Sequence, residues 1–335
     1  MRKKRRTNPA PAGILLLAVL IRLACEPGLL PSAAARLAAP AATTADAGAE
    51  AEAPDAINAA AEPAAAVQPL DLQIPAAAEA ASQPVTLALR EEAAQGLDIR
   101  NHTGYTVSLQ ELAGQALQFD ANAGGPTVLI LHTHTTEAYT PEPGWEYEAS
   151  DVMRTMDSRY NMVRIGDEVE QILTDAGLWV IHDERINDYP SYNGSYGTAL
   201  GRIEAWLERY PSIQVVLDLH RDAAEDAEGR YVATSCTASG ADAAQLMLVC
   251  GTDYGGLPHP NWRGNLAFAA QLQLALEQAD PGICRPLDLR CERFNQHTTA
   301  MSLLVEVGSV GDTLARALPA AQSLGRALAQ LLTQA

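Results

Sequence analysis

Short apolar segments alternate with amphipathic helical segments from Thr127 to the C-terminus of this 335-residue chain. Apolar runs of four to eight residues suit buried strands, and an apolar stripe at helical spacing predicts a packed helix. The predicted strands are 127–131, 178–181, 213–219, 231–235, 245–249 and 303–307, and the predicted helices are 161–176, 199–210, 261–278 and a last one from Asp312. Strands that alternate with helices predict an α/β fold with a mostly parallel sheet flanked by helices.

The first third of the chain has a different composition. Five basic residues, Arg2 to Arg6, precede a short apolar run, which predicts an export signal or an uncleaved membrane anchor in residues 1–30. Residues 31–84 are rich in Ala and Pro and predict a disordered linker. Residues 85–125 form a small element that leads into a single catalytic domain, 126–335. We therefore expect an extracytoplasmic protein, either anchored to the membrane through its N-terminal segment or secreted.

The net charge and the cysteines restrict which partners, disulfides and zinc ligands the chain can have. A net charge of −18 argues against nucleic acid as a partner. An even number of cysteines after the signal permits disulfides in an oxidising compartment, and Cys284 and Cys291 flank a short loop that a disulfide would close. Cys236 and Cys250 instead read as small apolar residues buried in strands. None of the four has the spacing of a zinc site.

Polar residues with metal-binding side chains follow three of the predicted strands. His132, His134 and Glu137 come after the first strand, His220 ends the strand at 213–219, and Glu306 follows Val305. Because open α/β sheets place their sites beyond the carboxyl ends of strands, we expect these side chains to converge. Three protein ligands with an adjacent carboxylate are typical of a catalytic zinc centre. The pattern predicts a zinc hydrolase.

The His132 and His134 pair leaves two interpretations open. Two residues apart on an extended backbone, the imidazoles face the same side. They either share the metal site, or one binds the metal while the other orients or contacts substrate. A serine-hydrolase elbow, a Walker loop and a dinucleotide fingerprint are absent from the sequence, so neither an α/β-hydrolase serine mechanism nor nucleotide binding is supported by a motif.

Five ordered segments resemble the stage II sporulation protein P family, over about residue 100 to the C-terminus. They are LILHTHTTEAY (129–139), NMVRIGDEV (161–169), LDLHRD (217–222), VCGTDYGG with NWRGNLAFAAQL (249–272), and RFNQHTTAMSLLVEVGSVGDT (293–313). The resemblance implies an amidase-like fold and a relation to zinc N-acetylmuramoyl-L-alanine amidases, which cut the amide between glycan strand and stem peptide. It also implies a role in forespore engulfment, with a lytic transglycosylase and a membrane scaffold as partners.

The resemblance also implies roles for particular residues. His134 matches the first zinc ligand and His220 the third, while Asp157 occupies the position of a carboxylate ligand before the first helix. Asp157 departs from the glutamate expected there, so Glu137, a further candidate catalytic residue, remains a rival. Glu306 matches the general base.

Two further expectations complete this interpretation. His132 belongs to the HTH signature and stays a candidate metal ligand. Arg221 is a candidate for pairing with a substrate carboxylate, although a structural salt bridge explains it equally well.

Two other functions also compete: a zinc endopeptidase or carboxypeptidase that cuts only peptide–peptide bonds, and a non-catalytic cell-wall-binding module.

Overall fold

The computed structural model describes residues 97–108, 111–112 and 115–333. The predicted signal or anchor (1–30), the predicted linker (31–84) and the start of the element at 85–125 lie outside the described residues. Within the described part of the chain, no helix is both long and apolar enough to cross a membrane.

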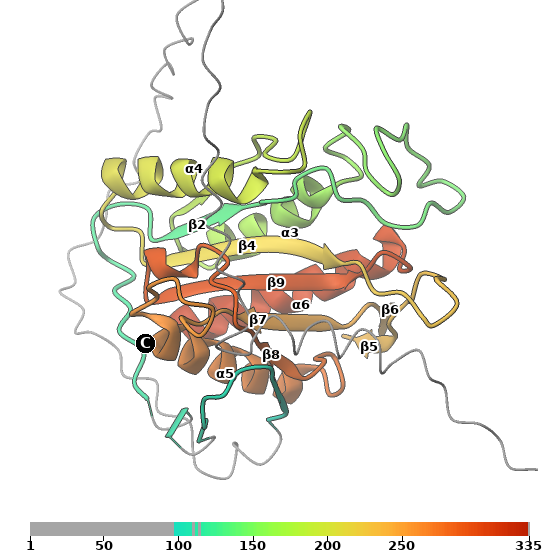
Figure 1. Cartoon of the computed structure of the whole chain (residues 1–335). Coiled ribbons are helices and arrows are strands. Elements are labelled where there is room, and N and C mark those ends of the chain that lie inside the picture. Colours follow the sequence, from blue (N-terminus) through green and yellow to red (C-terminus); the bar gives the residue numbers. More distant parts are fainter. Residues whose placement is uncertain (1–96, 109–110, 113–114, 334–335) are drawn as a thin grey trace, which may run out of the picture. The chain divides into compact units, whose positions relative to one another are not determined.

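A seven-stranded sheet forms the centre of the described residues (Figure 1). Its strands, in spatial order, are β1 (Ile99–Asn101), β8 (Leu287–Leu289), β7 (Leu246–Cys250), β9 (Met301–Ser309), β4 (Val215–Asp222), β2 (Val128–Leu131) and β3 (Val180–His182). All neighbouring strands pair in parallel except β7 and β9, which are antiparallel. The prediction of a mostly parallel sheet is confirmed.

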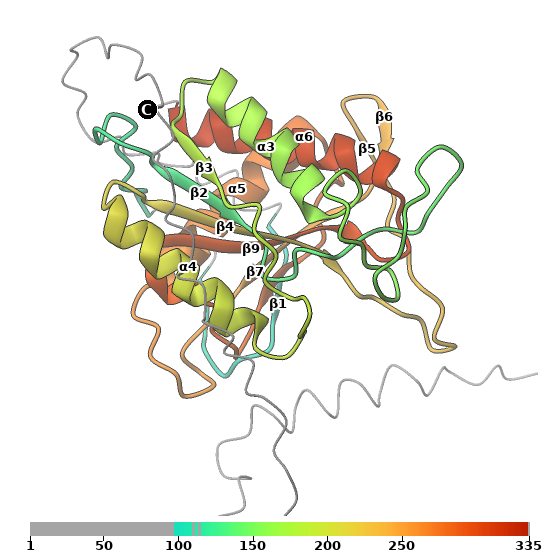
Figure 2. The ribbon, with the colours of Figure 1, turned by 90° about the horizontal axis from the view of Figure 1, so that it is seen from above.

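Helices cover both faces of this sheet (Figure 2). The helices are α3 (Met162–Asp175), α4 (Ser195–Arg209), α5 (Trp262–Ala279) and α6 (Leu314–Thr333). Alternate strand residues pack on opposite faces, as the pleat requires. Ile130 and Leu217 belong to the core with α3, α5 and α6, whereas Leu129 and Val216 pack with Ile203 of α4. The predicted helices at 161–176, 199–210 and 261–278 are all confirmed, although α4 begins four residues earlier than expected.

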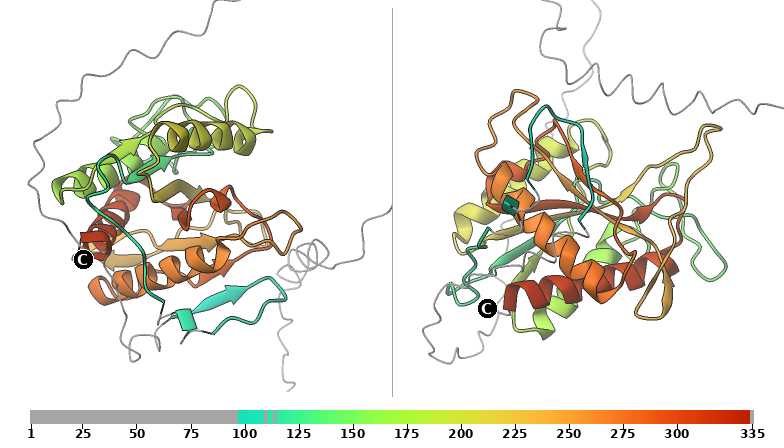
Figure 3. Two further views of the ribbon diagram at one scale, coloured as in Figure 1. Left: turned by 90° about the vertical axis from the view of Figure 1, so that its left-hand side faces the viewer. Right: turned by 90° about the horizontal axis from the view of Figure 1, so that it is seen from below.

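Other expectations need correction. The predicted strand at 231–235 is wrong: the extended segments there are β5 (Cys236–Ala238) and β6 (Ala241–Ala243), which form a two-stranded hairpin. Strands β1 and β8 were missed, because three residues are too few to show a period. β1 pairs with β8 at the edge of the main sheet, so the described part of the element at 85–125 extends that sheet (Figure 3).

The cysteines fit the simpler of the two interpretations. Cys236 lies in β5 and Cys250 in β7, and both carry free thiols. Cys284 is also a free thiol, so the predicted Cys284–Cys291 disulfide is wrong.

Candidate metal centre

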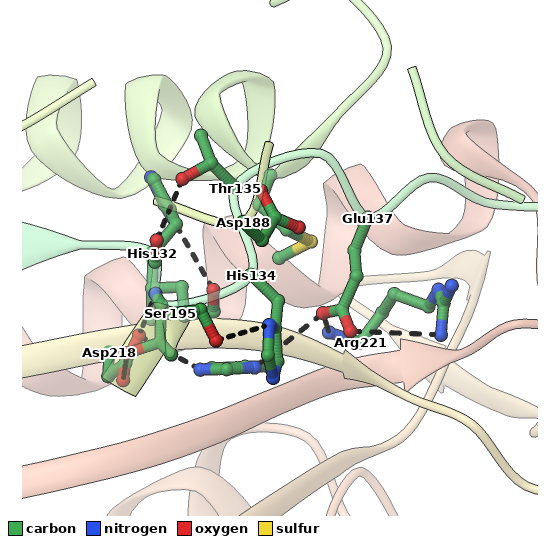
Figure 4. A network of polar contacts seen from close by, with 12 residues as sticks. His132, His134, Thr135, Glu137, Asp188, Ser195, Asp218 and Arg221 are labelled. Carbon is green, nitrogen blue, oxygen red and sulfur yellow. Dashed lines mark hydrogen bonds and ion pairs between the residues drawn. The ribbon is translucent and has the colours of Figure 1, made fainter. Parts of the chain in front are cut away.

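The chain turns sharply after β2, and this turn separates His132 from His134. Thr135 Oγ1 donates to the carbonyl oxygen of His132 (2.8 Å), and the Glu137 amide donates to the carbonyl of His134 (3.1 Å). Because the backbone is not extended here, the expectation that both imidazoles face the same side is wrong. His132 points to the α3 face of the sheet, whereas His134 contacts residues on the α4 side (Figure 4).

His132 forms a buried pair with His182 of β3. Its Nδ1 lies 3.1 Å from the carbonyl oxygen of Leu219, and its Nε2 lies 2.8 Å from His182 Nε2. Burial and the neighbouring His182 lower the pKa of His132 to about 3. Burial opposes ionisation of His182 as well, but Asp167 and Glu170 raise its pKa to about 9. The structure therefore places His132 in a different cluster from His134 and His220.

Gly166 of α3 makes room for this histidine pair. A Cβ atom at this position would lie 2.3 Å from His182 Nε2 and 2.8 Å from His132 Nε2. We expect Gly166→Ala to lower the free energy of unfolding by about 1–3 kcal/mol, because the packed rings have to shift. Gly201→Ala in α4 is the matched control, since a Cβ there meets nothing within 4 Å; it should stabilise the chain by up to about 1 kcal/mol. Denaturant titration of both variants measures the difference, and equal effects would contradict it.

His134, Glu137 and His220 lie close together and carry side chains of the types that bind metal ions. All three side chains are buried, His220 Nδ1 lies 3.6 Å from Glu137 Oε2, and the rings of His134 and His220 stand edge to face at 5.2 Å. A tetrahedral zinc with bonds of about 2.1 Å has ligand atoms about 3.4 Å apart, so the Glu137–His220 spacing is close to that of a shared ion. Two imidazoles and one carboxylate are also a common zinc donor set. The residues present fit zinc.

The neighbours of the two histidines leave one ring nitrogen of each available to a metal ion. Ser195 Oγ lies 3.3 Å from His134 Nδ1, so His134 Nε2 is left for a ligand. Asp218 Oδ1 lies 2.9 Å from His220 Nε2, and Asp218 also accepts hydrogen bonds from the amide and hydroxyl of Thr133. Carboxylates in this position fix the ring of a metal-binding histidine. Asp218 thus joins the turn after β2 to β4.

Positive charge surrounds Glu137. Burial alone would raise the pKa of its carboxyl, but contacts with His220 and Arg221 lower it to about 2. Arg154 Nη2 lies 3.3 Å from Glu137 Oε1. Glu137 is thus an anion held in the interior, as a metal ligand has to be.

Arg221 is buried and its donors are used inside the protein. Its Nε donates to the carbonyl of Ala138 (2.9 Å) and its Nη2 to the carbonyl of Met153 (3.1 Å). This arrangement supports the structural salt bridge over the expected contact with a substrate carboxylate, because the guanidinium is committed to backbone oxygens.

Glu306 lies in β9 directly beside His220 of β4. Its Oε2 is buried and has no hydrogen-bond partner among the described residues. Burial raises the pKa of Glu306 to about 8, and the nearby carboxylates of Asp222 and Glu137 act in the same direction. A carboxyl group that is poised near neutral pH and free of partners suits proton transfer.

The raised pKa of Glu306 predicts a pH dependence of stability in the metal-free chain. Folding favours the protonated carboxyl, whose unfolded pKa is about 4.5, so this contribution is fully present below pH 4.5 and is lost as pH rises to about 8. Unfolding free energies measured with EDTA across this range should therefore show wild type losing stability relative to Glu306→Gln. Parallel curves for the two proteins would contradict the shift.

Asp157 does not join the group. Arg159 holds it near the surface, with Arg159 Nη2 2.6 Å from Asp157 Oδ2, and the ion pair with Arg159 lowers the pKa of the carboxyl. Asp157 as a ligand remains a prediction, and the geometry favours its rival Glu137.

A cavity of about 450 Å³ opens beside Thr136, the residue before Glu137 in the chain. It is lined by Thr136, Ser150, Asp151, Arg154, Asp188, Tyr189, Pro190 and Tyr192. Tyr192 also stacks on His134 with ring centroids 4.4 Å apart. Sequence reasoning missed Arg154, Tyr192 and Ser195, because they lie in segments without periodic patterning or a motif.

The family model of Stage II sporulation protein P (SpoIIP) matches residues 47–329, which is most of the chain. The chain belongs to the SpoIIP family. The resemblance read from the five motifs is confirmed, and SpoIIP membership supports a cell-wall hydrolase that acts in sporulation. No curated protein matches the chain at a significant level.

Among solved structures, this SpoIIP chain is similar to the N-acetylmuramoyl-L-alanine amidase AmiC2 of Nostoc punctiforme, at 13% identity and a TM-score of 0.39, over 63% of this chain and 97% of that one. It is also similar to the amidase Ami1 of Mycobacterium abscessus, at 14% identity and a TM-score of 0.36, over 62% and 96%. The catalytic domain of the amidase CwlV from Bacillus (Paenibacillus) polymyxa var. colistinus matches at 12% identity and a TM-score of 0.37, over 62% and 98%. Similarity at this level does not by itself assign an activity.

Proposed function

We propose that the chain is an exported, zinc-dependent peptidoglycan hydrolase of the N-acetylmuramoyl-L-alanine amidase type. The observation that carries the proposal is that His134 and Glu137, which follow β2, lie near His220 of β4. Glu306 of β9, whose Oε2 has no hydrogen-bond partner among the described residues, pairs in register with His220. SpoIIP membership supports the cell wall as the place of action and sporulation as the process. Anchoring by residues 1–30 and cooperation with a lytic transglycosylase and a membrane scaffold form part of this proposal.

His134, Glu137 and His220 would hold the zinc. When bound, zinc lowers the pKa of a coordinated water and polarises a carbonyl. Glu306 removes a proton from the attacking water and returns it to the departing L-alanine amine, which requires a carboxyl that takes and releases protons near neutral pH. Asp218 holds the His220 ring, and Ser195 holds His134.

The cavity lined by Thr136 and Arg154 would give the substrate a place to bind. Its lining combines the Arg154 cation with the rings of Tyr189 and Tyr192. Arg154 lines the cavity, where its guanidinium pairs with Asp188 and Glu137, whereas Arg221 is buried against backbone oxygens.

The test is digestion of purified sacculi by the full-length chain with zinc, with products read by mass spectrometry. Free stem peptides that begin with L-alanine, together with peptide-free glycan, are expected, and EDTA should abolish both. Shortened stems still attached to glycan would replace the amidase by an endopeptidase or carboxypeptidase. Binding to sacculi without any product from a folded, zinc-loaded chain would favour a cell-wall-binding module.

A further inference from the structure

A second cluster of metal-binding side chains lies on the α3 face of the sheet, away from the group around His220. Asp167 and Glu170 are one turn apart on α3, and His182 ends β3. One donor atom from each of the three lies within 4.8 Å of the other two. His182 Nδ1 is 3.4 Å from Asp167 Oδ1 and 3.4 Å from Glu170 Oε2. This cluster has no part in the chemistry described above.

Hydrogen bonding places one hydrogen of His182 on Nε2. A backbone carbonyl only accepts, so His132 Nδ1 donates to Leu219 and His132 Nε2 is left as an acceptor. His182 Nε2 must then carry the hydrogen that it shares with His132 at 2.8 Å. In neutral His182, the remaining lone pair on Nδ1 points toward two carboxylates. The lone pair and the two carboxylates repel one another unless a cation lies between them.

The distances favour a metal ion as this cation. At 3.4 Å, both contacts exceed the usual 2.7–3.2 Å range of N–H···O hydrogen bonds. His182 Nδ1 is buried and has no hydrogen-bond partner among the described residues, and the His182 side chain is only 1% exposed. The same 3.4 Å is the ligand–ligand distance of a tetrahedral zinc with bonds of about 2.1 Å.

The surroundings give an ion both access and a fixed ligand. The side chains of Asp167 and Glu170 are 46% and 37% exposed, so an ion reaches them from solvent. His182 is held from behind by His132, in the space that Gly166 leaves free. Imidazoles that bind metals usually have their second nitrogen anchored in this way.

We propose that Asp167, Glu170 and His182 form a second divalent-cation site, suited to Zn²⁺, with a fourth position open to water. Its ion joins α3 to β3. Through His132 it also supports the turn that carries His134, because the His132 carbonyl accepts hydrogen bonds from Thr135 Oγ1 and Asn187 Nδ2. This site stands independently of the proposed hydrolase activity.

Zinc counting on the full-length chain tests the proposal. The Asp167→Asn/Glu170→Gln double variant should bind one Zn²⁺ fewer per chain than wild type, measured by elemental analysis after dialysis and by titration against a chromophoric chelator. The matched control is Asp175→Asn/Glu184→Gln, which removes two exposed charges from the same region and should leave the count unchanged. Equal Zn²⁺ counts for wild type and the Asp167→Asn/Glu170→Gln variant would overturn the proposal. The cation between His182 Nδ1 and the two carboxylates would then be a proton.

Two further measurements keep the result interpretable. Zn²⁺ should raise the melting temperature of wild type more than that of the Asp167→Asn/Glu170→Gln variant, and an identical shift in both would overturn the site. His134→Ala should remove a different ion, so that the two losses add. If His134→Ala leaves the count unchanged while the double variant lowers it, the metal centre of the proposed hydrolase fails and the second site stands.

Discussion

Glu306→Gln is expected to reduce turnover on peptidoglycan by roughly 10²- to 10⁴-fold while zinc binding stays intact, which is the range that a positioned general acid–base supplies. Glutamine keeps the size of the side chain but cannot exchange a proton with water or with the leaving amine. Glu306 lies beside His220 in the sheet, so the loss should fall on the chemical step. Steady-state kinetics on a soluble muropeptide, with elemental analysis of the same samples, measure both quantities.

The control for this variant is Glu208→Gln, which removes an exposed carboxylate on α4. It should retain wild-type turnover. Burial raises the pKa of Glu306 to about 8, and neutral glutamine has the size of the protonated side chain, so we expect the metal-free fold to tolerate Glu306→Gln. A variant that keeps zinc and full turnover would remove Glu306 from the mechanism and leave its unpaired oxygen without an explanation.

The sequence predicted where the site lies better than it predicted which side chains face one another. The end of β2 is recognisable because an apolar run meets three metal-binding side chains, and parallel strands bring their carboxyl ends to one edge. The direction of each imidazole depends on the turn through Thr133 and Thr135. That turn is fixed by contacts with Asp218 and Asn187, which come from distant parts of the chain. Local spacing does not contain that information, so His132 was expected to face the same side as His134.

The cluster around His182 was missed for a related reason. His182 ends a three-residue strand, and in the sequence nothing distinguishes it from an ordinary histidine. Its significance comes from Gly166, which lets two imidazoles approach α3, and from the spacing of Asp167 and Glu170 on one helical face. Each feature is common alone, and only the fold brings them together.

The choice between the two candidate carboxylate ligands leads to the second prediction with a large effect. Glu137→Gln should weaken binding of the zinc at this centre by more than about 100-fold, because loss of a direct ligand exceeds the 10- to 100-fold cost of losing a supporting contact. Turnover should fall with it. Asp157→Asn should change neither quantity, because its carboxylate is paired with Arg159 at the surface. Competition with a chelator of known affinity gives the metal affinity of each variant.

Loss of Glu137 also removes the partner of two guanidinium groups, and breaking a buried ion pair costs about 3–5 kcal/mol. Arg154 and Arg221 both lie within 4.0 Å of its carboxylate. A destabilised fold would imitate a lost ligand, so His134→Gln serves as a second variant that leaves both arginine pairs in place. If His134→Gln and Glu137→Gln each lose the same zinc while His134→Gln melts near wild type, the loss belongs to the coordination group. If instead Asp157→Asn loses the metal and Glu137→Gln keeps it, the carboxylate ligand is Asp157 and the segment around it moves to reach His134 and His220.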